Sequence, residues 1–144
     1  MSSYASLTEL KRFLPRYPID ATTEPSDTDC QLYLDQIEAR VNGFLVGQGY
    51  TIPTTGPQSL LMLKDLTLVG AAWYTTRVMF PGANQGVVTS YRDEFNIIMT
   101  QLKTGDLVLP DAGKDSTNKV MDGQNTTAIA YASYTPFVSR STQF

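Results

Sequence analysis

Apolar residues recur every three or four positions along several stretches of this chain, which is the spacing of amphipathic helices. The clearest stretch begins after Ser26, a residue type that suits the N-cap, and reaches Gly47, a good helix terminator. Its apolar and polar residues fall on opposite faces, Cys30, Tyr33, Leu34, Ile37, Val41, Phe44 and Leu45 against Gln31, Asp35, Glu38 and Asn42. This pattern predicts a helix from about residue 26 or 27 to residue 47.

A shorter helix is predicted before it, over residues 7–14. Ser6-Leu7-Thr8-Glu9 has the sequence of a capping box, in which the Ser6 hydroxyl accepts the Glu9 amide and the Glu9 carboxylate accepts the Ser6 amide. Pro15 would end this helix. Its apolar residues, Leu7, Leu10, Phe13 and Leu14, share one face.

The third predicted helix, over residues 58–80, is apolar nearly all round, and Pro57 stands where a first helical residue belongs. A helix without a wide polar face must be covered on several sides. Two arrangements satisfy this requirement. Either the helix lies at the centre of the bundle, or neighbouring subunits cover what this chain cannot.

A fourth helix is predicted from about residue 87 to residue 103, with Gly105 in the left-handed position after it. Its apolar face carries Val88, Tyr91, Phe95, Ile98, Met99 and Leu102. Before the third helix, residues 50–52 are expected to be briefly extended. We therefore expect an all-α fold, a small bundle of about four helices that forms a domain over residues 1–110.

Residues 111–144 have a different composition, polar at first and then rich in Thr, Ser, Tyr and Ala. They contain too few large aliphatic residues for a core of their own. Over residues 125–144 the only charge is Arg140. Composition leaves two interpretations open, a disordered solvated end and an extended tail that docks on other chains by strand addition or by aromatic anchors. We adopt the docking tail as the working hypothesis.

Composition and charge exclude several classes of function. The chain has 144 residues, a net charge of −3 and no histidine. Without histidine, Ser-His-Asp and Cys-His nucleophile systems and the commonest metal ligand are absent. The acidic balance argues against a basic patch that would hold nucleic acid tightly. We therefore expect neither an enzyme nor a bound cofactor or metal.

The sequence also bears on compartment and on membrane association. The opening MSSYASLTELKRF lacks the layout of a signal peptide, and the longest apolar stretch, residues 66–80, is too short to span a bilayer and contains Arg77. Soluble behaviour, without a membrane partner, is the expectation. Cys30, the single cysteine, lies on the apolar face of its helix and is expected to be a small core residue.

Three local patterns that could suggest chemistry are better explained as solvated polar residues. Asp93 and Glu94 are adjacent, so on a helix they point about 100° apart and cannot flank one bond as a catalytic pair. The stretch AGKDS at 112–116 lacks the first glycine and the Ser or Thr of a phosphate-binding loop. Asp111, Asp115 and Asp122 are too widely spaced for a calcium loop.

In order along the chain, YASLTELKRFLP, LYLDQIEARVNGFLVGQGYTIPTTGPQSLLMLKDLTLVGAAWYTTR and YRDEFNIIMTQLKTGDLVLP resemble the head-tail connector proteins of tailed bacteriophages, also called adaptor or head-completion proteins. The resemblance covers about residues 4–110. It implies a helical subunit repeated as a ring, commonly a dodecamer, that sits on the portal and forms part of the channel through which DNA leaves. The acidic balance would keep DNA from binding the channel wall.

From this resemblance we expect a structural protein of the virion neck, assembled in the host cytoplasm, whose partners are further copies of itself, the portal protein and the next neck or tail protein. The expected docking residues are Tyr131, Tyr134, Phe137 and Phe144 in the tail, with Phe13 and Tyr17 near the first helix. Asp35 and Glu38 are expected to face the channel.

Two alternatives remain open. The chain could be another neck or tail-completion component, a stopper or a terminator, which would be richer in strands. It could also be a small cytoplasmic helical regulator, which would share the composition but form at most a dimer.

Overall fold

The computed structural model describes residues 2–82 and 86–114, and this part of the chain contains four helices and no strand. They are α1 (Leu7–Phe13), α2 (Asp27–Gly47), α3 (Pro57–Met79) and α4 (Gly86–Thr104). The predicted all-α bundle is confirmed. The ends of each helix lie within about one residue of the prediction, a difference no larger than that between methods of assigning helix ends.

Local signals account for most of the helix ends. Ser6 and Glu9 form the predicted capping box at α1, and Ser26 and Asp29 form a second one at α2. Pro57 is the first residue of α3, where its missing N–H leaves no helical hydrogen bond unmade. Gly105 follows α4 with a φ of 85°, a left-handed conformation that favours glycine.

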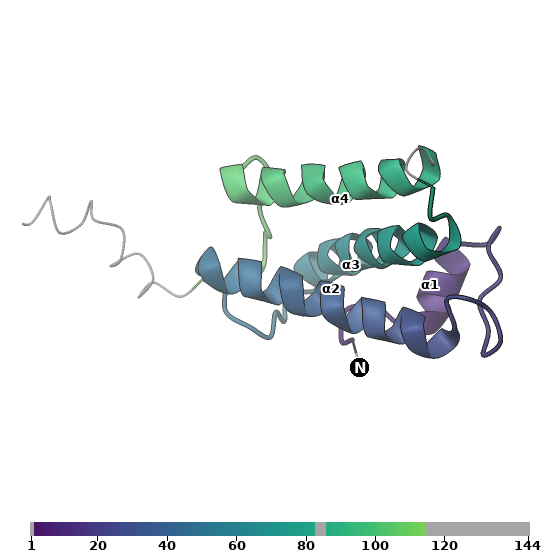
Figure 1. Cartoon of the computed structure of the whole chain (residues 1–144). Coiled ribbons are helices and arrows are strands. Elements are labelled where there is room, and N and C mark those ends of the chain that lie inside the picture. The colour runs from purple at the N-terminus through teal and green to yellow at the C-terminus, as the bar shows by residue number, and fades with distance from the viewer. Residues whose placement is uncertain (1, 83–85, 115–144) are drawn as a thin grey trace, which may run out of the picture.

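Helix α3 lies at the centre of the bundle, which decides between the two arrangements left open by its sequence. In Figure 1 it runs between α2 and α4, and α1 packs near one end. Gly70 marks the closest approach, because a Cβ atom built there would lie 2.7 Å from Ile37 of α2 and 2.9 Å from Phe95 of α4. No side chain fits at this position without moving its neighbours.

The core consists of two apolar clusters on α3. The first joins α2, α3 and α4 with Tyr4, Ile37, Val41, Leu45, Tyr50, Leu63, Leu66, Val69, Phe95, Leu102 and Leu109. The second packs α1 and the N-terminal half of α2 against the other part of α3 with Ala5, Leu10, Leu14, Ile19, Cys30, Leu34, Leu68, Ala71 and Ala72. Cys30 is a buried core residue, as predicted, and burial raises the pKa of its thiol.

Residues 111–114 are attached to the helical domain. Tyr50 and Lys114 form an isolated antiparallel bridge, and the Thr51 amide donates to the Gly113 carbonyl at 2.8 Å. The extended conformation predicted near residue 50 therefore occurs as this single bridge. Residues 111–114, which follow the boundary predicted at residue 110, are attached to the first turn of α3 and to the loop before it, and the boundary itself stays a prediction.

None of the helices in the described ranges is long and apolar enough to cross a membrane. Several aliphatic side chains nevertheless remain exposed on the bundle. They are Leu32 and Val46 on α2, Leu61 and Val78 on α3, Ile97 on α4 and Val108 after α4.

Candidate docking site

The N-terminal segment, residues 2–6, is held against α2 by a carboxylate. Glu38 accepts hydrogen bonds from the Ser3 amide at 2.6 Å and the Tyr4 amide at 3.3 Å, and from the hydroxyls of Ser2 and Ser3. Tyr4 is buried, and its hydroxyl donates to Asn42 at 2.7 Å. Burial opposes the charge on Glu38, but these hydrogen bonds outweigh it and lower the pKa of the carboxyl.

A second carboxylate joins α1 to α3. Glu9 accepts the Ser6 amide at 2.8 Å within the capping box, and its other oxygen lies 2.6 Å from Nζ of Lys64. The hydrogen bond from Lys64, with that from Ser6, lowers the pKa of Glu9 to about 2. The two side chains are 32% and 38% exposed, so this ion pair is only partly shielded from solvent and its stabilisation is small.

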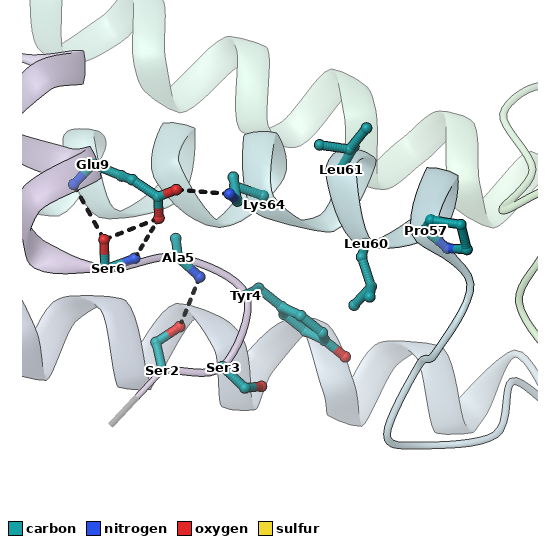
Figure 2. A pocket seen from close by; sticks show the side chains of 10 residues that line it. All are labelled: Ser2, Ser3, Tyr4, Ala5, Ser6, Glu9, Pro57, Leu60, Leu61 and Lys64. Carbon is teal, nitrogen blue, oxygen red and sulfur yellow. Dashed lines mark hydrogen bonds and ion pairs between the residues drawn. The ribbon is translucent and has the colours of Figure 1, made fainter.

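Between these two attachments lies a hollow of about 560 Å³. We call it the N-terminal hollow, and it is lined by Ser2, Ser3, Tyr4, Ala5, Ser6, Glu9, Pro57, Leu60, Leu61 and Lys64. Figure 2 shows the Glu9–Lys64 pair at one end of the hollow and Pro57 at the other. Leu61 is 66% exposed, the most exposed of the large apolar side chains on the described helices.

The sequence interpretation missed Asp111, which caps α3. Its carboxylate accepts the Gln58 amide at 2.9 Å, the Ser59 amide at 2.8 Å and the Ser59 hydroxyl. The hydrogen bond from that hydroxyl is the main reason why the pKa of Asp111 is lowered. One signal could have indicated this role: Gly56 is the N-cap of α3 and has no side chain to accept these amides.

The weaker docking candidates, Phe13 and Tyr17, lie outside the N-terminal hollow. Their rings pack within the chain, Phe13 on Tyr91 with centroids 5.9 Å apart and Tyr17 on Phe80 at 5.4 Å. Both nevertheless line a separate hollow of about 280 Å³ between the end of α1 and the start of α4. The rings are half-buried, so only part of each could contact another chain.

The two residues expected to face a channel differ in their surroundings. Glu38 binds the chain's own N-terminal segment, a partner that the polar face of α2 did not indicate, and these bonds argue against a channel-facing role for it. Asp35 accepts a hydrogen bond from Gln31 at 3.1 Å. The stronger docking candidates, Tyr131, Tyr134, Phe137 and Phe144, lie outside the described residues.

Of the polar patterns set aside in the sequence, Asp111 caps α3, and the other described residues lie on the surface. Asp93 pairs with its neighbour Arg92 at 3.0 Å. Lys114 places its Nζ atom 4.5 Å from the centre of the Tyr50 ring, a cation–π contact. Over residues 2–82 and 86–114, no group of three or more Cys, Asp or Glu side chains is arranged to hold a metal ion.

The lining of the N-terminal hollow combines an apolar wall with polar groups at its edge. Its apolar wall of Ala5, Pro57, Leu60 and Leu61 would accept an apolar side chain, and the hydroxyls and the Glu9–Lys64 pair at its edge would accept a polar tip. In comparisons with family models, curated proteins and solved structures, none matched this chain.

Proposed function

We propose that this chain is a structural adaptor of the neck of a tailed bacteriophage, a subunit that forms a ring between the portal and the tail and extends the DNA channel. The sequence resemblance suggests this function, and the arrangement of the outer helices supports it. Because one helical fold can serve many functions, the proposal depends on the surfaces that the bundle presents.

The observation that carries the proposal is that aliphatic side chains are exposed on both outer helices of the bundle, α2 and α4. Leu32 and Val46 are exposed on α2, and Ile97 is exposed on α4, while α3 separates these helices (Figure 1). Single exposed aliphatic residues are ordinary on a soluble protein. Their presence on two helices that α3 keeps apart, however, is compatible with a head-to-tail contact, in which identical subunits use two different surfaces.

Ring formation by such a contact is a geometric mechanism. The α2 surface of one subunit would pack on the α4 surface of the next. Repetition of this contact gives a closed ring only if a whole number of the rotations between neighbouring subunits makes one full turn. Gly70 makes the three helices a close-packed wedge, which keeps that rotation constant. A net charge of −3 offers few cations to replace the counterions of DNA, so DNA would pass without specific binding.

Several finer features belong to the same proposal. The ring is a dodecamer, its partners are the portal protein and the next neck or tail protein, and the subunit reaches the virion after assembly in the host cytoplasm. Asp35 remains the candidate channel-facing residue. Tyr131, Tyr134, Phe137 and Phe144 remain the candidate anchors toward another chain, and Phe13 and Tyr17 can contribute only their exposed edges.

Cryo-electron microscopy of particles that contain this chain is the direct test. We expect a ring of this subunit between capsid and tail. In a second arm, Ile97→Asp should abolish incorporation into the ring while the free subunit stays folded, whereas Thr8→Asp, which adds the same charge on α1, should incorporate normally. A chain that is absent from virions and monomeric at high concentration would refute the proposal and favour the regulator alternative.

The stopper or terminator alternative is less consistent with the described residues. A stopper or terminator would be richer in strands, whereas residues 2–82 and 86–114 contain only the isolated Tyr50–Lys114 bridge beside four helices. The position of the subunit in the same particle images would distinguish it from an adaptor.

A further inference from the structure

We propose that the N-terminal hollow of one subunit receives the aromatic C-terminal segment, Tyr131 to Phe137, of the neighbouring subunit. This inference rests on the proposed ring and names the surface that its docking segment occupies. It follows from the lining of the hollow, from the composition of the segment and from the place where the described chain ends.

The lining of the hollow suits an aromatic side chain. Leu61 is largely exposed beside the exposed Pro57 and the partly buried Leu60, so an aromatic ring placed there would remove apolar surface of these residues from water. Glu9 and Lys64 are opposite in sign and 2.6 Å apart, which leaves this edge of the hollow close to neutral. A volume of about 560 Å³ is within the range of small-ligand pockets.

The segment has the complementary chemistry. Residues 125–144 carry one charged side chain, Arg140, so docking of this segment would cost little free energy for the desolvation of charge. Tyr131, Tyr134 and Phe137 offer large apolar rings, and the two tyrosines add hydroxyls that can bond to the polar edge of the hollow. Rigid aromatic side chains of this kind bury much area for little loss of side-chain entropy.

The described chain ends close to the hollow. Asp111 is bonded to Gln58 and Ser59, the two residues that follow Pro57 at the end of the hollow. Gly113 is bonded to Thr51. The last described residues, 111–114, are therefore attached to the helical domain, and Asp111 lies next to the Pro57 end of the hollow.

Chain length favours the hollow of the neighbouring subunit. From Lys114 to Tyr131 an extended chain spans at most about 55 Å. Three helices packed 8–10 Å apart are about 30 Å across, so this length reaches an adjacent subunit. A return to the hollow beside residue 111 would need only a small part of it. In a ring, the same head-to-tail exchange would fill the hollow of every subunit.

Disulfide cross-linking of the full chain tests the inference. Cys30 is the single cysteine, so Cys30→Ala gives a thiol-free background in which Leu61→Cys and Tyr134→Cys are combined. The matched control combines Ala21→Cys, exposed in the loop before α2, with Tyr134→Cys. Circular dichroism first establishes that each variant is folded.

After mild oxidation, non-reducing gels should contain a ladder of covalent multimers, at least about tenfold more abundant for the Leu61 pair than for the control, because docking raises the local thiol concentration. Tyr131→Ser with Phe137→Ser in the same background should abolish that difference. A cross-link within single chains, or multimers no more abundant than in the control, would overturn the inference.

The mass of the wild-type assembly separates this inference from the proposed function. A ring that forms without the Leu61–Tyr134 cross-link leaves the adaptor proposal standing and rejects the hollow as its docking site. A chain that forms no ring, either alone or in particles, rejects the adaptor proposal itself.

Discussion

Leu61 and Leu63 stand two residues apart on α3, yet Leu61 is 66% exposed at the N-terminal hollow and Leu63 is completely buried against α2 and α4. The buried side of α3 is stabilised by close packing of apolar side chains, which leaves no space even for a Cβ at Gly70. The side that faces the N-terminal segment is stabilised by hydrogen bonds and an ion pair, and it keeps a hollow.

The two sides of α3 are therefore stabilised by different interactions. Apolar packing is insensitive to pH and intolerant of changes in volume. Hydrogen bonds to Glu9 and Glu38 are directional and depend on the charge of each carboxylate. The packed side therefore fixes the arrangement of α2, α3 and α4, and the other side keeps an open hollow.

The largest effect is expected from the two leucines. Leu63→Ala should lower the free energy of unfolding by about 2–5 kcal/mol, because it opens a cavity in the core. Leu61→Ala should change the same quantity by less than about 0.5 kcal/mol, because its side chain is already in water. Urea unfolding of the two variants measures both. Equal losses would mean that Leu61 is covered in solution and not exposed as described.

Two glycines provide the next comparison. Gly70→Ala should lower the free energy of unfolding by about 1–3 kcal/mol, because the new methyl group overlaps Ile37 and Phe95. Gly43→Ala lies on the exposed face of α2 with no atom within 4 Å of the new Cβ, and it should raise stability by about 0.5–1 kcal/mol. Thermal unfolding by calorimetry should give shifts of opposite sign. A stabilised Gly70→Ala variant would contradict the close approach of three helices.

Substitutions of Glu38 measure how strongly its hydrogen bonds hold the N-terminal segment. Glu38→Ala removes the acceptor for residues 2–4 and should lower the free energy of unfolding by about 1–2 kcal/mol. Glu38→Gln keeps an oxygen acceptor without the charge and should lose less. Hydrogen exchange should show the Ser3 and Tyr4 amides losing protection first. Full protection of these amides in Glu38→Ala would exclude the carboxylate as the group that holds the segment.

The smallest effect is expected from Glu9 at low pH. The pKa of Glu9 is lowered from 4.5 to about 2 in the folded chain, so the unfolded chain binds the proton more readily. Its contribution to stability is therefore complete above about pH 4.5 and is lost as the pH falls toward 2. The pKa of Glu38 is also lowered in the folded chain, so its contribution to stability is likewise lost as the pH falls.

Nuclear magnetic resonance titration of the Glu9 carboxyl carbon measures this effect directly. We expect a midpoint near 2 in the wild-type chain and a higher midpoint in Lys64→Met, which removes the main cause of the shift. A wild-type midpoint at 4.5, unchanged by Lys64→Met, would show that the pair does not form in solution.

The helices and their ends could be predicted from the sequence because their signals are local. The Ser6–Glu9 capping box, Pro57 at the start of α3 and Gly105 after α4 act over a few residues, within the reach of one helical turn. The periodic apolar positions of α2 likewise identify its buried face without any knowledge of its neighbours. The sequence by itself therefore determined how many helices form in the described chain and which residues they contain.

Only the tertiary structure decided which distant residues meet. Glu38 binds the segment at Ser3, 35 positions away, and Asp111 caps α3 at Ser59, 52 positions away. The alternating polar face of α2 gave no sign that Glu38 would be covered, because the partner depends on where the N-terminal segment crosses the helix. Side chains far apart in sequence become neighbours through the packing of whole helices, and the N-terminal hollow exists only once that packing is complete.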